Sequence, residues 1–333
     1  MNSLALLMIE FAALAAVIVV AGMFLTRFAD QLGRITGLGS SMSGLILLAI
    51  ATSLPELAIG CNAALIPAPD LAVGDLLGSS LFNLLILATI DLLYRNSGRM
   101  FSRTAAAHSL SAVAGILLTA VVLLFLLIDV PWPFPRVGAG SLSVIVVYLL
   151  ALRLIYNDQQ VGAREAALLE QAPATPGTWK RPAIGFGCAA AVVFVAARAM
   201  TYAADELAVE TGLGGTLVGT VFVALATSLP EVSTTYASVR IGAPDMAVGN
   251  ILGSNAFNMA ILFGVDLFYD GHLLAVASQT HALTATAVII VTAVATMGLL
   301  NRAEKRLWVI EPDAVLVILL IVASLLLVYY VGG

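Results

Sequence analysis

The sequence contains one six-residue stretch twice: Ala-Thr-Ser-Leu-Pro-Glu occupies positions 51–56 and returns unchanged at positions 226–231. The same offset of 175 residues aligns the surrounding segments without a gap, and about half of the positions in 36–94 are identical to their partners. These identities concentrate on polar residues. A duplication kept only for packing is the alternative, but the polar identities favour two copies of one functional unit.

Composition places this chain in a membrane. Of its 333 residues, 61% are hydrophobic and 11% are charged, whereas soluble proteins are about 45–50% apolar and about 25% charged. A net charge of −5 with 15 basic residues leaves no surface suited to nucleic acid. The two cysteines, Cys61 and Cys188, suit neither a disulfide framework nor a metal site. The sequence therefore predicts an integral membrane protein whose surroundings are the lipid bilayer.

Ten stretches are long and apolar enough to be transmembrane helices, each of which needs about 20 residues. They are residues 4–27, 42–66, 71–94, 105–128, 139–156, 183–204, 215–240, 246–269, 281–301 and 310–331. The predicted fold is therefore an all-α membrane protein. A polar segment rich in Pro, residues 157–182, separates five helices in residues 1–156 from five in residues 183–333.

Each predicted repeat has five helices, an odd number, so the second copy must enter the membrane from the opposite side. Secondary transporters use such inverted repeats, with the binding site at the midplane where the repeats meet. Basic residues concentrate in cytoplasmic connections, and here thirteen fall in the odd-numbered connections and two in the others. We therefore expect a cytoplasmic linker and both termini outside. The excess of Arg over Lys and the abundant Ala indicate a bacterial inner membrane.

Two glutamates, Glu56 and Glu231, lie near the middle of predicted helices. An ionised carboxylate at the bilayer centre costs about 3 kcal/mol or more, and neither helix core supplies a Lys or an Arg. A bound cation is the natural partner. The alternative is a pair of protonated side chains that donate hydrogen bonds between helices.

A proline precedes each of these glutamates. Pro55 and Pro230 have no N–H, so each kinks its helix and frees the carbonyl four residues earlier, that of Ala51 or Ala226. Within a membrane such a carbonyl needs another partner. Hydroxyl groups share the face of each glutamate: Thr52 and Ser53 in the first copy, Thr227 and Ser228 in the second. An ordinary kink satisfied by these hydroxyls is the alternative.

The helices that follow add more oxygen atoms. Each carries a serine and, four residues later, an asparagine: Ser79 and Asn83 in the first copy, Ser254 and Asn258 in the second. Such residues either bind an ion or join neighbouring helices by hydrogen bonds. Carboxylates, hydroxyls, amides and carbonyls form an all-oxygen set, which suits Ca²⁺ with its about 6–8 ligands. Zinc or copper would require His or Cys.

These motifs resemble the two alpha repeats of the calcium/cation antiporter superfamily, and of its sodium/calcium exchanger branch in particular. The resemblance implies that Glu56 and Glu231 are the central ion ligands and that the other hydroxyl groups donate oxygen atoms. The resemblance also implies that the backbone carbonyls of Ala49 and Ala224 are ligands. It implies further that the first helix of each repeat slides as a gate. The family often has an acid where this chain has Asn258, so the expected site charge comes from the two glutamates alone.

We therefore expect a secondary-active antiporter, not an enzyme, that exchanges Na⁺ for Ca²⁺ by alternating access and works as a monomer. No cofactor is expected, because Ca²⁺ and Na⁺ are the transported ions. The closest alternative is a proton/calcium antiporter, since two facing carboxylates repel each other when no cation is bound. In that branch a His typically follows the glutamate, whereas Leu57 and Val232 do so here. A passive channel and an intramembrane enzyme are further alternatives, but no His-Glu-X-X-His motif is present.

Overall fold

The computed structural model describes residues 3–36, 49–93, 108–128, 130, 132–134, 136–167, 178–240, 244–300 and 312–332. Within these ranges every regular element is a helix, and the helices are joined by short connections. The expected all-α membrane fold is therefore confirmed.

The helices follow one another in two sets. The first half contains α1 (Ser3–Thr36), α3 (Ala49–Thr52), α4 (Leu54–Leu65), α5 (Pro69–Leu93), α6 (Ser109–Leu127) and α7 (Ala139–Ala167). The second half contains α8 (Lys180–Thr211), α9 (Gly214–Leu217), the π-helical segment η3 (Val218–Val223), α10 (Ala224–Thr227), α11 (Leu229–Arg240), α12 (Pro244–Asp266), α13 (Leu273–Val276), α14 (His281–Leu300) and α15 (Pro312–Gly332).

Nine helices in the described ranges, with α9 to α11 counted as one, are long and apolar enough to cross a membrane. The remaining predicted helix, residues 42–66, is described only from Ala49 onward, as α3 and the 12-residue α4. Helix ends differ from prediction. α7 continues to Ala167, beyond the predicted end at 156, and α8 begins at Lys180. Both extensions are rich in polar residues, so hydropathy alone does not include them in a predicted membrane span.

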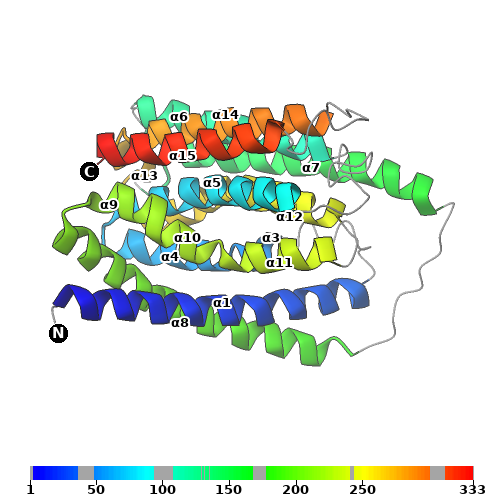
Figure 1. Ribbon diagram of the computed structural model, residues 1–333, viewed down its shortest axis with the longest axis horizontal. Coiled ribbons are helices and arrows are strands. Elements are labelled where there is room, and N and C mark those ends of the chain that lie inside the picture. The colour runs from blue at the N-terminus through cyan, green and yellow to red at the C-terminus, as the bar shows by residue number, and fades with distance from the viewer. Residues whose placement is uncertain are drawn as a thin grey trace.

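Corresponding helices of the two halves run in opposite directions through the bundle. Figure 1 shows the helices lying along the long axis of the molecule, with both chain ends at the same end. The corresponding first helices, α1 and α8, pack side by side and run in opposite directions. The second repeat is thus inverted relative to the first, as an odd number of helices in each repeat requires.

The centre of the bundle is formed by α5 and α12. Within their spans 89% of α5 and 78% of α12 is buried, against 17% of α1. The pair α1 and α8 lies on one side of this centre, and α6, α7, α14 and α15 lie on the other (Figure 1). The outer helices can face lipid, because a helix that is apolar on all sides is stable in contact with lipid or with other helices. The polar residues of α5 and α12 are thereby enclosed at the centre of the bundle.

Glycines allow α5 to approach the second repeat closely. A Cβ at Gly74 would lie 3.1 Å from the carbonyl oxygen of Thr216, and a Cβ at Gly78 would lie 2.8 Å from the Cβ of Ala224. Small residues are common where membrane helices touch, because lipid tails are as apolar as the helices and close packing must hold them together. This contact places α5 directly against η3 and α10.

The substitution Gly78→Ala should weaken this contact. The added methyl overlaps the backbone of Thr220, so we expect a loss of about 1–3 kcal/mol and a lower melting temperature of the detergent-solubilised protein. Gly115→Ala is the matched control, because no atom lies within 4 Å of the position its Cβ would take. Equal melting temperatures for the two variants would contradict a close contact at Gly78.

Candidate cation-binding site

Two broken helices place the glutamates. Ser53 separates α3 from α4, and Ser228 separates α10 from α11. Each break is only one residue long, because Leu54-Pro55 and Leu229-Pro230 begin the next helix. A proline is tolerated in the first turn of a helix, since the backbone N–H that it lacks would have no partner within the helix there. Glu56 and Glu231 follow in the first turn of their helices. The N-terminus of a helix favours a negative charge, so the breaks supply part of the field that these carboxylates need.

Both glutamates are completely buried, and none of their four carboxylate oxygens has a hydrogen-bond partner within the described protein. Glu56 and Glu231 occupy equivalent positions of the two repeats. Buried charges are normally paired or bound to a metal ion. The surroundings of Glu56 and Glu231 therefore fit a bound cation better than a permanently empty site.

Hydroxyl pairs join the two repeats beside the glutamates. The hydroxyl oxygens of Thr52 and Ser254 lie 3.3 Å apart, and those of Ser79 and Thr227 lie 3.1 Å apart. Each residue of the first pair maps onto one of the second by the sequence offset of 175 residues. The structure thus repeats the same contact about a pseudo-two-fold axis and brings four predicted ligands to one interface.

The carbonyls of Ala49 and Ala224 lie at the start of these segments but are already engaged. Ser53 donates its backbone N–H to the oxygen of Ala49 at 3.0 Å, and Thr52 approaches the same oxygen at 3.3 Å. The second repeat has the same arrangement around Ala224. Because a carbonyl oxygen has two lone pairs, these carbonyls are the least available of the predicted ligands in this structure.

The remaining predicted ligands are buried and keep free oxygen atoms. The hydroxyls of Ser53 and Ser228 have no hydrogen-bond partner in the described protein, nor does either amide atom of Asn258. Asn83 donates its amide N–H to Asn255 at 2.9 Å, which leaves its carbonyl oxygen unpaired. Orphaned buried polar atoms are rare in proteins, so their presence in both repeats keeps these residues as candidate ligands.

Asp75 was not among the predicted ligands. This residue is completely buried, and its Oδ1 accepts a hydrogen bond of 3.0 Å from Thr227. Asp75 therefore lies beside the predicted ligands, at a position where the second repeat has the neutral Asn250. The available signal was spacing, because Asp75, Ser79 and Asn83 recur every four residues and share one helix face.

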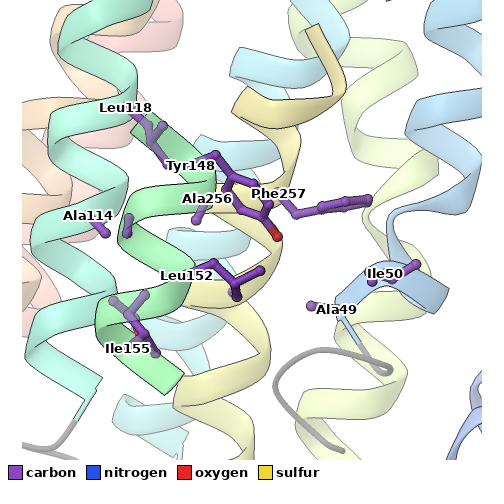
Figure 2. A pocket seen from close by; sticks show the side chains of 12 residues that line it. Ala49, Ile50, Ala114, Leu118, Tyr148, Leu152, Ile155, Ala256 and Phe257 are labelled. Carbon is purple, nitrogen blue, oxygen red and sulfur yellow. The ribbon is translucent and has the colours of Figure 1, made fainter. Parts of the chain in front are cut away.

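An apolar cavity adjoins the site and is lined in part by Ala49, one of the predicted ligands. Figure 2 shows residues of α3, α6, α7 and α12 around this cavity, with Ile50 and Phe257 on its inner wall and Leu118, Tyr148 and Leu152 on the other side. Walls of this kind offer a hydrated cation almost no oxygen. The free oxygen atoms lie instead between the broken helices and α5 and α12, where an ion without its water shell would bind.

Comparisons with known proteins agree with this arrangement. The sequence matches the sodium/calcium exchanger protein family over residues 6–157 and 181–332. The inner membrane protein YrbG of Escherichia coli (strain K12) is 30% identical over 243 residues, covering 71% of this chain and 72% of that protein. The sodium/calcium exchanger MaX1 of Methanosarcina acetivorans is 31% identical over 121 residues, covering 36% of this chain and 33% of that protein.

A solved structure shows the same fold. The sodium-calcium exchanger NCX_Mj, soaked with 100 mM Na⁺ and 10 mM Sr²⁺, matches with a TM-score of 0.62 at 16% identity. The match covers 97% of this chain and 98% of that one. Because the family match extends across both halves and the fold agrees, this chain belongs to the sodium/calcium exchanger family and is a membrane transporter, not an enzyme.

Proposed function

We propose that this protein exchanges Na⁺ for Ca²⁺ by alternating access at the buried site between its repeats. One observation carries the proposal: Glu56 and Glu231 occupy equivalent breaks of two inverted repeats, and all of their carboxylate oxygens are buried without a protein partner. The name of the relative MaX1, sodium/calcium exchanger, and the Na⁺ and Sr²⁺ soaked into NCX_Mj support the same ions.

In this proposal the glutamates bind the ions from opposite repeats, and neutral oxygen atoms complete the shell. The neutral ligands are Thr52, Ser53, Ser79 and Asn83 from the first repeat, Thr227, Ser228, Ser254 and Asn258 from the second, and the carbonyls of Ala49 and Ala224. Carboxylates and neutral oxygens are the ligands that hard cations prefer. The same oxygens can hold either one Ca²⁺ or several Na⁺ ions, so the two loads compete.

Competition becomes exchange because the empty site is costly. Without a cation, bare carboxylates remain in a low-dielectric interior, and each uncompensated ion is disfavoured by several kcal/mol. A bound ion removes this penalty, so the protein switches the side of the membrane from which its site is accessible only when an ion is bound. Obligatory exchange follows from that difference, whereas a passive channel needs no such coupling.

The first helix of each repeat is placed to act as a gate. A Cβ at Gly22 of α1 would lie 2.7 Å from the ring of Pro230, so α1 crosses the break of the second repeat in direct contact. In the same way α8 packs on α4 of the first repeat. Each gate helix therefore contacts the broken helix of the opposite repeat, and sliding of the α1–α8 pair would open one side as it closes the other.

Orientation completes the proposal. We place both termini outside and residues 157–182 in the cytoplasm, between repeats at 1–156 and 183–333, because basic residues concentrate on that side. Sodium then enters down its gradient while Ca²⁺ leaves the cell. The name of the Escherichia coli relative, inner membrane protein, supports a bacterial inner membrane.

Neutralising either glutamate should abolish transport. Glu56→Gln and Glu231→Gln keep the size of the side chain but remove its charge, so we expect Na⁺-driven ⁴⁵Ca²⁺ uptake into proteoliposomes to fall to background. Glu210→Gln, the same change at an exposed position of α8, is the control and should transport normally. Uptake near the wild-type rate in a Glu56 or Glu231 variant would show that this carboxylate is not a central ligand.

The driving ion can be identified with the unmodified protein. We expect ⁴⁵Ca²⁺ uptake to follow an imposed Na⁺ gradient and to respond to a potassium–valinomycin potential, because more than two Na⁺ ions per Ca²⁺ would move net charge. A proton gradient of the same size, imposed without sodium, should have little effect. Uptake that follows the proton gradient and ignores sodium would instead establish the proton/calcium alternative.

A further inference from the structure

We propose that Asp75 forms a second cation position beside the glutamate pair and that Na⁺ occupies it in the sodium-loaded protein. This inference rests on the proposed function and concerns the ions that the same site carries. It starts from an asymmetry, because Asp75 of α5 corresponds to the neutral Asn250 of α12. The repeats therefore offer one additional negative charge, on one side of the site only.

The carboxylate of Asp75 is half satisfied by the protein. Oδ1 accepts the hydrogen bond of 3.0 Å from Thr227, whose hydroxyl also lies 3.1 Å from that of Ser79. Oδ2 has no hydrogen-bond partner in the described protein, although the side chain is completely buried. Three oxygen-bearing side chains thus gather at one point, and the one with the negative charge keeps an oxygen free.

Packing holds Asp75 at this position. The residue before it, Gly74, would place a Cβ 3.1 Å from the backbone nitrogen of Thr220 in η3, so α5 touches the second repeat directly. A helix in such close contact cannot rotate its charged side chain toward water. A cation bound at this position would compensate the buried charge of Asp75 where it lies.

The ion at Asp75 is separate from the one between the glutamates. Within the described residues no three carboxylate, His or Cys side chains converge closely enough to hold one metal ion. Asp75 nevertheless adjoins the ligand set, because it accepts the hydrogen bond from Thr227. Asp75 is therefore a neighbour of the central ion, not a third ligand to it.

The ligand chemistry favours a monovalent hard cation. One carboxylate and two hydroxyl groups neutralise a charge of +1 and supply few oxygens, whereas Ca²⁺ needs about 6–8. Sodium is the hard monovalent ion in the proposed exchange. The three carboxylates buried at this site, Glu56, Glu231 and Asp75, then match a load of three Na⁺ ions in charge. When Ca²⁺ binds between the glutamates instead, the Asp75 position holds no Ca²⁺.

The test is Asp75→Asn, which makes this position match Asn250. Asparagine keeps an oxygen to accept the Thr227 hydrogen bond, so the substitution removes charge with little change of shape. We expect the variant to bind Ca²⁺ but to couple one fewer Na⁺ to each Ca²⁺. The coupling number is read from the membrane potential at which net ⁴⁵Ca²⁺ flux stops for a series of Na⁺ gradients.

Two further variants make the result specific. Asp70→Asn, on the same helix, leaves an acceptor for the backbone N–H of Ser278 and should not change the coupling number. The exchange variant Asp75→Asn/Asn250→Asp returns a carboxylate at the equivalent position and should restore the lost Na⁺. This second variant also shows that the protein tolerates Asn at position 75.

A binding measurement that needs no transport gives an independent readout. Sodium should raise the melting temperature of the purified protein with a steeper concentration dependence in the wild type than in Asp75→Asn. Equal steepness and equal coupling numbers would overturn the inference, as would a change in coupled protons instead of sodium. Loss of Ca²⁺ binding in Asp75→Asn would also overturn it, by making Asp75 a Ca²⁺ ligand. Failure of the proposed function would appear differently, as absence of Na⁺-dependent uptake in the wild type.

Discussion

The structure is organised around two carboxylates that the protein buries without a partner. Glu56 and Glu231 are completely buried, and their oxygen atoms receive no hydrogen bond from the described protein. Such an arrangement is unfavourable unless an ion completes it. The breaks in the helices, the hydroxyl groups around them and the tight packing between repeats all serve to present these carboxylates to an ion while water is kept out.

The surrounding helices divide the remaining tasks. α5 and α12 are almost entirely enclosed and carry the polar residues, whereas α1 and α8 face outward and pack mainly on each other. Glycines at 74 and 78 make the contact between repeats close enough for hydroxyl groups to meet across it. The centre of the bundle is thus tightly packed, whereas the α1–α8 pair contacts it over a smaller area, as the proposed sliding of that pair would require.

The repeat made much of this structure predictable. An exact copy of six residues identified Glu56 and Glu231, and an odd number of helices in each repeat gave the inversion. The pairing of Thr52 with Ser254 could not be predicted, because register between helices depends on packing in three dimensions. Asp75 was left out of the predicted ligands for a related reason: the ligands were chosen from positions shared by both repeats, and the partner of Asp75 is Asn250. Hydropathy likewise could not show that α7 extends to Ala167, since that part of the helix lies outside the apolar segment.

The paired Thr–Ser contacts have a thermodynamic consequence. If the two repeats exchanged conformations, the contact between Thr52 and Ser254 would take the geometry of the one between Thr227 and Ser79, and the reverse. The inward-facing and outward-facing states would then be nearly degenerate in these contacts, so a small free energy is enough to convert one into the other. Degeneracy of this kind makes transport reversible. Any preference for one orientation must come from the residues at which the repeats differ.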